Sequence, residues 1–203
     1  MRYRPISRLL TVAGLAITIA TAAVTFAVSP ATSDDKASTA NGFVEGLIDQ
    51  HGRPVAAKRL LGKPTVFHFG FTHCPVVCPT TLNEVATLMA DLGPRADRLN
   101  FVFITVDPER DTASVLKTYI GYFDERIIGL TGSEKAIAAI AKSFKTTYAK
   151  RPHEDGYNMD HAIFAYLTDR SLRMVSTLYI GSGANRNLVR KRIDKLLGAE
   201  LSN

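Results

Sequence analysis

The chain has 203 residues, of which 22% are charged and 46% are hydrophobic, with 14 Gly and 9 Pro. This balance excludes a disordered chain, a collagen-like chain and a multispanning membrane protein. The formal net charge is +6, but Arg2, Arg4 and Arg8 precede the first acidic residue, and the remainder carries only +3. So mild a charge, without a Lys/Arg cluster, gives no indication of nucleic-acid binding. The two cysteines exclude a disulfide-dense scaffold and a four-cysteine zinc module.

The first thirty residues predict a membrane anchor. Residues 9–28 contain no charge, and as a helix rising about 1.5 Å per residue they would span about 30 Å, the thickness of a hydrocarbon core. The arginines lie before this run, which predicts a cytoplasmic N-terminus and export of everything after Ser29. The alternative is a signal peptide cleaved after Ala31, but the run is longer than the usual core of about 7–15 residues, which favours a retained anchor.

Three segments organise the chain. We expect an N-terminal membrane anchor over residues 1–30, a tether over the small and polar residues 31–41, and one folded domain over residues 42–203. A domain of this length buries about 70% of the surface that its unfolded chain exposes. The sequence contains no internal repeat and no low-complexity stretch.

Within the domain, predicted strands alternate with predicted helices. The expected elements are a hairpin over residues 43–55 turning at His51–Gly52, a strand over 65–71, a helix over 79–91, a strand over 100–106, a helix from Asp111 or Thr112 to Tyr122, a helix from Ser133 to Lys145, a hairpin of strands 162–167 and 172–178, and a helix over 182–197. Residues 126–130 are too short a run to classify. This order predicts an α/β sheet with helices on both faces, in the topology of a thioredoxin-like fold.

The two cysteines lie where the first buried strand leads into a helix. Cys74 and Cys78 are separated by three residues and follow the strand at 65–71. Pro79 suits a first helical position, because its missing N–H has no partner there in any case. Cys78 is therefore expected to cap the helix, whose positive end stabilises a thiolate.

Three kinds of site are considered for this cysteine pair: a structural disulfide, a redox-active dithiol and a metal site. A structural disulfide would close a five-residue loop and contribute only about 2 kcal/mol, against about 4.7 kcal/mol for a hundred-residue loop. A dithiol oxidoreductase on this fold normally has two residues between its cysteines and a late cis-proline beside them, whereas the last proline here is Pro152. A peroxiredoxin would have Thr three residues before its cysteine, where this chain has Phe71 and Pro75.

The third kind is a soft-metal site. Two thiolates and one imidazole form a three-coordinate set suited to Cu(I), and no further cysteine offers the fourth ligand that zinc requires. His161 stands where a polar loop over residues 151–159 is expected to lead into a strand, at the edge where this fold gathers its active-site loops. Position alone favours His161 slightly over His153, which lies inside that loop.

The other three histidines are less suited to this role. His51 lies in a predicted turn, and His68 lies within a buried strand, where a hydrogen-bonded core residue is the commoner case. His73 adjoins Cys74, and adjacent side chains do not easily reach one ion.

Three segments together resemble the signatures of the Sco/SenC copper chaperones of cytochrome c oxidase assembly. They are FGFTHCPVVCP at residues 69–79, VDPERDT at residues 106–112, and Asp160–His161. The resemblance extends over the exported domain and the N-terminal anchor. It implies a thioredoxin-like fold with an added N-terminal β-hairpin, preceded by one transmembrane helix. It also implies that Cys74, Cys78 and His161 bind copper, and that the two cysteines are able to form a redox disulfide.

The same resemblance implies a place and a partner. The partner is subunit II of cytochrome c oxidase, whose dinuclear copper centre faces the same compartment as this domain, with a periplasmic copper donor upstream. The protein would be a single-pass protein of the bacterial inner membrane with its soluble domain in the periplasm, or a soluble periplasmic protein if the N-terminal segment is cleaved. Asp107 would lie near the site or face the partner, and the alternative is a carboxylate that caps the turn before Pro108. Many family members carry Asp where this chain has Val76, so the site is less negative here.

Two functions from different classes follow. The first is a membrane-anchored copper chaperone that passes its metal by ligand exchange. The second is a thiol–disulfide reductase, an enzyme, that keeps the copper-ligating cysteines of the oxidase reduced. His161 discriminates between them, because disulfide chemistry does not need such a ligand.

Overall fold

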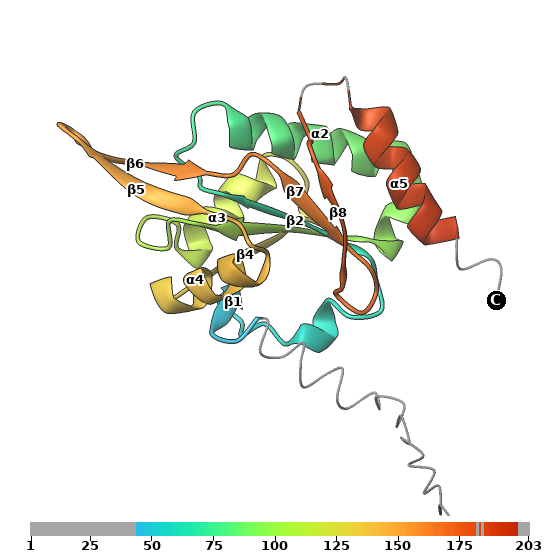
Figure 1. Cartoon of the computed structure of the whole chain (residues 1–203), viewed down its shortest axis with the longest axis horizontal. Coiled ribbons are helices and arrows are strands. Elements are labelled where there is room, and N and C mark those ends of the chain that lie inside the picture. The colour runs from blue at the N-terminus through green and yellow to red at the C-terminus, as the bar shows by residue number, and fades with distance from the viewer. Residues whose placement is uncertain (1–43, 182, 184, 199–203) are drawn as a thin grey trace, which may run out of the picture. The chain divides into compact units, whose positions relative to one another are not determined.

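Figure 1 shows the computed structural model of the chain, which describes residues 44–181, 183 and 185–198. The predicted anchor and tether, residues 1–30 and 31–41, lie outside the described residues. Within the described part, no helix is long and apolar enough to cross a membrane. The elements in chain order are β1 (Leu47–Asp49), η1 (Ala57–Arg59), β2 (Thr65–Gly70), α2 (Val77–Leu92), η2 (Gly93–Arg98), β3 (Asn100–Thr105), α3 (Ala113–Gly121), β4 (Ile128–Gly132), α4 (Glu134–Ser143), β5 (Tyr148–His153), β6 (Gly156–His161), β7 (Ala165–Thr168), β8 (Met174–Leu178) and α5 (Arg186–Gly198).

The core is a six-stranded sheet in the order β1-β4-β3-β2-β7-β8. Strands β2, β3 and β4 are parallel, and β1, β7 and β8 run antiparallel to their neighbours. Every residue of β2 and β3 is buried, which explains their unbroken apolar runs, since both faces of these strands are covered. Because β2 and β3 are parallel, their carboxyl ends meet at one edge of the sheet, and the segments that follow them emerge side by side.

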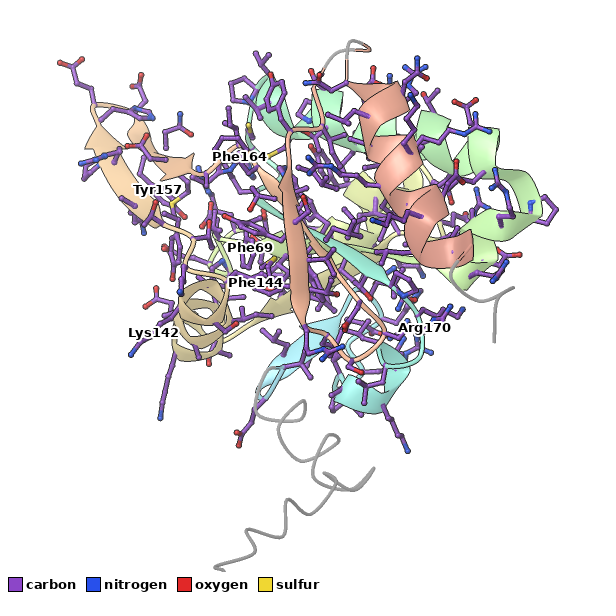
Figure 2. All side chains as sticks on the ribbon, turned by 45° about the vertical axis from the view of Figure 1, so that its right-hand side comes forward. Phe69, Lys142, Phe144, Tyr157, Phe164 and Arg170 are labelled. Atoms are coloured by element: carbon purple, nitrogen blue, oxygen red, sulfur yellow. The ribbon has the colours of Figure 1, made fainter. Side chains whose placement is uncertain are left out.

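Aromatic contacts show which helices cover each face. On one face, Phe67 and Phe69 of β2 pack against Phe144, just beyond α4, with ring centroids 4.8 and 5.4 Å apart (Figure 2). On the other face, Phe103 of β3 contacts Tyr119 of α3 with a centroid separation of 6.0 Å. The expected arrangement of helices on both faces is therefore confirmed.

Helix α5 is joined to α2 by a charged pair. Arg186 of α5 contacts Glu84 of α2 at 2.8 Å, and the hydroxyl of Thr81 donates to the carbonyl of Ile180. These contacts join residues about a hundred positions apart in the sequence. They hold the C-terminal segment against α2, the helix that begins at the cysteines.

The predicted N-terminal hairpin is much reduced. β1 pairs with β4, while the returning segment makes a single bridge between Ile48 and Pro54 rather than a second strand. The turn occurs where it was expected, with Gly52 at a φ of 75°. The unclassified residues 126–130 overlap β4, a buried strand whose short length and two glycines leave little periodicity to recognise.

The largest departure from the sequence-based expectation is the loop predicted over residues 151–159, which was wrong. These residues belong to an antiparallel hairpin, β5–β6, with six cross-strand pairs from Tyr148–His161 to His153–Gly156. Most of its side chains are exposed, so the sequence lacks the alternation of apolar and polar residues that marks a half-buried strand. Figure 1 shows the hairpin extending beyond the six-stranded sheet.

Gly70, the last residue of β2, fixes how closely the strand approaches the cysteine helix. A Cβ at this position would lie 2.5 Å from the sulfur of Cys78 and 2.8 Å from the ring of Phe103. We predict that Gly70→Ala lowers the free energy of unfolding by about 1–3 kcal/mol, because neither neighbour has room to move away. Urea denaturation measures this change. Gly121→Ala at the end of α3 is the matched control, since its Cβ would meet nothing within 4 Å and should not destabilise the domain. An equal loss in both variants would contradict the packing argument.

Candidate metal centre

The cysteine segment is a tight turn between β2 and α2. The backbone N–H of Cys74 donates to the carbonyl of Phe71 at 3.2 Å, and the N–H of Cys78 donates to the sulfur of Cys74 at 3.4 Å. Cys78 lies in the first turn of α2 and is completely buried, whereas Cys74 is 9% exposed at the mouth of the turn. The two cysteines do not form a disulfide in this structure.

This arrangement corrects the predicted helix start. α2 begins at Val77, so Cys78 is its second residue and Pro79 its third, rather than the cap and the first residue. Pro79 is still tolerated because N–H groups in the first turn have no partner within the helix. The sulfur that accepts the free N–H at the helix start is therefore that of Cys74, not that of Cys78.

The two thiols have opposite acidities. The hydrogen bond from the Cys78 thiol is the largest influence on Cys74 and lowers its pKa well below the ordinary value, with further help from His161 and from backbone N–H groups. The same hydrogen bond, together with burial, raises the pKa of Cys78. The pair therefore holds a thiolate at Cys74 and a thiol at Cys78 at neutral pH.

His161 ends β6 and reaches the cysteines from the other side. Its Nε2 atom lies 3.5 Å from the sulfur of Cys78, and its Nδ1 atom lies 3.0 Å from the carbonyl oxygen of Ala162. Since a carbonyl accepts only from a protonated nitrogen, Nδ1 carries a hydrogen and Nε2 is the nitrogen that faces the sulfurs. Burial disfavours a charge on the imidazole, but hydrogen bonds to Cys74 and to Ala162 outweigh it and raise the pKa of His161.

Two aromatic rings hold the imidazole edge to face. Phe71 lies 5.7 Å from the His161 ring at an interplanar angle of 84°, and His68 lies 6.1 Å away at 79°. Burial, followed by the effect of His161, lowers the pKa of His68 to about 4, so this ring is neutral near pH 7. His68 is therefore a neutral side chain of β2 that packs beside His161. Its buried position agrees with the expectation from the sequence.

The three residues named from the sequence converge on one point. The sulfurs of Cys74 and Cys78 and a ring nitrogen of His161 all lie within 4.8 Å of one another, the only such group of metal-ligating side chains among the described residues. Ligands about 2.1–2.3 Å from an ion are separated by about 4 Å, so a small closure would bring all three onto one metal. Two sulfurs and one nitrogen suit a soft monovalent ion such as Cu(I) better than zinc, which requires a fourth ligand.

The remaining histidines do not join this group. His51 and His153 are exposed, at the turn after β1 and at the far end of β5. The side chain of His73 is 55% exposed, and its Nδ1 lies 3.1 Å from the hydroxyl of Thr72. The preference for His161 over His153 therefore agrees with the positions of both side chains.

Asp107 follows β3 and is only 3% exposed. Its carboxylate accepts hydrogen bonds from Nε of Arg110 at 2.5 Å and from the hydroxyl of Tyr157 at 2.9 Å. The carboxylate faces the hairpin that carries His161. A role for Asp107 at the site or toward a partner stays a prediction.

Four residues that the sequence analysis did not assign to the site surround it: Thr72, Arg110, Asp111 and Tyr157. Asp111 was considered only as a helix cap, a position that Thr112 takes. Three of the four lie in or next to the motifs at residues 69–79 and 106–112, so those motifs were the available signal. Tyr157 had none, since it lies in the segment expected to be a loop.

Comparison with known proteins decides the family. The model of the SCO1/SenC family matches residues 31–198. The chain belongs to the SCO1/SenC family. The resemblance drawn from the three motifs is thereby confirmed.

Relatives of this SCO1/SenC protein occur in bacteria and mitochondria. It is 39% identical over 139 residues to an SCO2-like protein of Rickettsia felis, covering 67% of this chain and 68% of that one. It is 38% identical over 151 residues to the mitochondrial SCO1 homolog 1 of Arabidopsis thaliana, covering 73% of this chain and 45% of the plant protein.

Solved SCO1/SenC structures match the fold. The structure of Bradyrhizobium japonicum ScoI with copper bound has a TM-score of 0.69 and 40% identity, covering 74% of this chain and 96% of that one. Yeast Sco1 with copper bound has a TM-score of 0.68 and 31% identity, covering 76% and 86%. The predicted thioredoxin-like α/β fold is confirmed.

The acidity of Cys74 is directly testable. We predict that the reduced domain reacts with iodoacetamide at Cys74 at a rate that stays on its plateau well below pH 8.5, the ordinary pKa of a cysteine, because the thiolate is already formed. Cys78→Ala removes the largest stabilising hydrogen bond and should shift the profile toward higher pH. His73→Ala, which changes an exposed neighbour, is the control and should leave it unchanged. A wild-type profile centred near pH 8.5 would contradict the assignment.

Proposed function

We propose that this protein is a membrane-anchored copper chaperone that delivers copper to the dinuclear copper centre of cytochrome c oxidase subunit II. One observation carries the proposal: two cysteine sulfurs and the Nε2 face of one imidazole converge within 4.8 Å at the edge of the sheet. Two SCO1/SenC relatives with 40% and 31% identity have structures with copper bound, which supports copper as the cargo. The choice of subunit II rests on the resemblance to the Sco/SenC chaperones.

The site's own residues suit a transfer by ligand exchange. Cu(I) would be held by the thiolates of Cys74 and Cys78 and by Nε2 of His161, with the proton of the Cys78 thiol released on binding. A three-coordinate ion leaves room for an incoming thiolate or imidazole to bond before any ligand of this chain departs. Copper stays in one oxidation state throughout, so no electron donor or acceptor is required.

Burial sets an order among the three ligands. Cys78 is enclosed by β2 and α2, whereas Cys74 and His161 lie at the rim. An incoming ligand therefore meets the side of the ion held by Cys74 and His161. We infer that these two bonds are the first to be exchanged and that Cys78 releases the ion last.

We further propose the organisation expected from the sequence. Residues 1–30 anchor the chain in the bacterial inner membrane, residues 31–41 form a tether, and residues 42–203 form the copper-binding domain in the periplasm, with a periplasmic copper donor upstream. This placement is supported by the arginines before the apolar run, because positive residues on that side favour export of the segment that follows.

A second function is favoured by the placement of the two cysteines, with Cys74 at the mouth of the site and Cys78 completely buried beneath it. A low-pKa sulfur at the mouth of a site and a protonated sulfur beneath it suit a nucleophile and a resolving thiol. The Cys74 thiolate would attack a disulfide of the target, and Cys78 would then displace the target from the mixed disulfide. The target gains two electrons and leaves as a dithiol, while Cys74 and Cys78 form a disulfide that an external thiol reductant must reopen.

A pair of histidine variants separates the two functions. We predict that His161→Ala weakens Cu(I) binding by more than about 100-fold, since it removes a ligand and not merely a supporting group. It should fail to support oxidase assembly while Cys74 and Cys78 still exchange disulfides. Affinity is measured by competition with a Cu(I) chelator. His153→Ala, an exposed histidine on the same hairpin, is the matched control and should behave as wild type.

The outcomes distinguish the functions. Copper loss in His153→Ala with retention in His161→Ala would contradict the ligand assignment. Normal oxidase assembly with His161→Ala would favour the reductase, because thiolate attack depends on the cysteines alone.

Topology gives an independent prediction. A reporter fused after Asn203 should be active only outside the cytoplasm, and most of the protein should sediment with the membrane fraction, because residues 9–28 are expected to remain as an anchor. Protease protection in spheroplasts, compared with intact cells, is the second measurement. Recovery of a soluble exported form that begins near Thr32 would show instead that the segment is a cleaved signal peptide.

A further inference from the structure

The segment VDPERDT at residues 106–112 has no part in ligand exchange, yet it lies between the two halves of the proposed copper site. It follows β3, whose carboxyl end is adjacent to the carboxyl end of β2 and the cysteine turn. Two neighbouring residues of the segment, Arg110 and Asp111, bind opposite halves of the site.

Asp111 holds the cysteine half. Its carboxylate is completely buried and accepts hydrogen bonds from the backbone N–H and the hydroxyl of Thr72, at 2.9 and 2.6 Å, and from the hydroxyl of Thr105 at 2.7 Å. Thr72 lies two residues before Cys74. The cysteine turn is therefore tied to the end of β3 by a fully buried carboxylate.

Arg110 holds the histidine half through Tyr157, a residue of β6. Its guanidinium carbon lies 3.8 Å from the centroid of the Tyr157 ring, and its Nη1 donates to the Tyr157 carbonyl at 3.1 Å. Its Nε donates to Asp107, which also accepts the Tyr157 hydroxyl. The ring, the carbonyl and the hydroxyl of one tyrosine are thus all engaged. We call Asp107, Arg110 and Tyr157 the clasp.

Other ion pairs of the hairpin are weaker. The ion pairs Lys150–Glu109 and Arg151–Asp160 join side chains that are about half exposed or more, where such pairs contribute little. A cavity of about 410 Å³, lined by Asp107, Lys150 and residues of α4 among others, separates part of the hairpin from the domain. Met159 of β6 is buried against the core, and the clasp is the polar attachment of the hairpin to the segment after β3. Figure 2 shows Tyr157 on the hairpin, away from Phe69 and Phe144.

Tyr157 is four residues before His161 on the same strand. The β5–β6 ladder pairs Tyr157 with Pro152 and His161 with Tyr148, so a displacement of Tyr157 is transmitted along the strand. Arg110 also lies 5.9 Å from the centroid of Phe71, which packs on the His161 ring.

We propose that Arg110 is a positioning residue that, through Tyr157 and Asp107, holds β6 where Nε2 of His161 meets the two sulfurs. The inference rests on the proposed function, because it assigns the clasp a purpose in copper binding. Loss of the guanidinium frees the hairpin, and the ion keeps its two sulfurs but loses a well-placed nitrogen. Arg110 is not one of the three grouped metal-ligating residues and acts through His161.

Arg110→Gln in the full chain tests this inference. Competition with a Cu(I) chelator should show binding weakened by about 10–100-fold, the usual range for a group that orients a metal ligand. In the His161→Ala background the same substitution should cause no further loss, because there is no imidazole left to position. Arg110→Lys keeps the charge but not the planar fork and should recover only part of the affinity. Arg151→Gln, which removes an exposed ion pair of the same hairpin, should bind copper as wild type does.

A second measurement does not depend on copper. Amide hydrogen exchange of the metal-free protein should be faster in β5 and β6 of Arg110→Gln than in wild type, with β2, β3 and α2 unchanged. Tyr157→Phe, which removes only the hydroxyl bond to Asp107, should give a smaller change and serves where Arg110→Gln does not fold.

The results separate this inference from the proposed function. Wild-type copper affinity and wild-type hydrogen exchange in Arg110→Gln would overturn the proposed role of Arg110. So would an equal loss of affinity when Arg110→Gln is made in the wild type and in His161→Ala. If the wild-type protein binds no copper, the chaperone proposal fails, and the exchange experiment alone decides whether Arg110 holds the hairpin.

Discussion

The hydrogen bond from the N–H of Cys78 to the sulfur of Cys74 is the interaction on which the site depends. It exists because α2 starts between the two cysteines, so that a free N–H of the helix points back at the earlier residue. A spacing of three residues between the cysteines places one sulfur outside the helix end and the other inside the first turn. The Cys78 thiol donates to the same sulfur of Cys74 and has the largest effect on its pKa, so the charge resides on the outer sulfur while the inner, buried one stays neutral. A negative charge at the rim costs less than a buried one, and it is available to a cation or to a partner.

His161 lies 83 residues after Cys78 in the sequence, so no local backbone geometry fixes its position relative to the cysteines. It is brought in by a hairpin whose side chains are mostly exposed, so its position depends on the buried Met159 and on a few polar contacts. The two halves of the site therefore differ in kind. The cysteine half is part of the β2–α2 packing and is as rigid as the core, whereas the histidine half is held by side chains that exchange with water when they open. A metal site assembled in this way is well suited to release its ion, since one ligand moves without disturbing the fold.

The sequence predicted the cysteine half of the site well, but it did not predict the hairpin that carries the histidine. Strands β2 and β3 were recognisable because both of their faces are buried, which produces continuous apolar runs, and the cysteines that follow β2 were placed correctly at the sheet edge. The helix start was misplaced by two residues because a proline is accepted throughout the first turn, so Pro79 does not define the first position. The hairpin was missed because most of its side chains face water, which leaves no regular alternation of apolar and polar residues. The contact of Arg110 with Tyr157 crosses 47 residues and depends on where the hairpin folds back, which no local pattern encodes.

The exposed, uncharged side chain of Val76 bears on how fast a partner protein associates with the site. Its side chain is 65% exposed between the two cysteines, and it carries no charge. Two basic residues of the hairpin are neutralised by acidic neighbours, Lys150 by Glu109 and Arg151 by Asp160. Long-range attraction between charged surfaces accelerates association and weakens as salt is added, whereas neutral surfaces meet at about 10⁵–10⁶ M⁻¹s⁻¹. These neutral groups give an approaching partner little electrostatic steering beside Val76, so the rate of encounter there should depend only weakly on ionic strength.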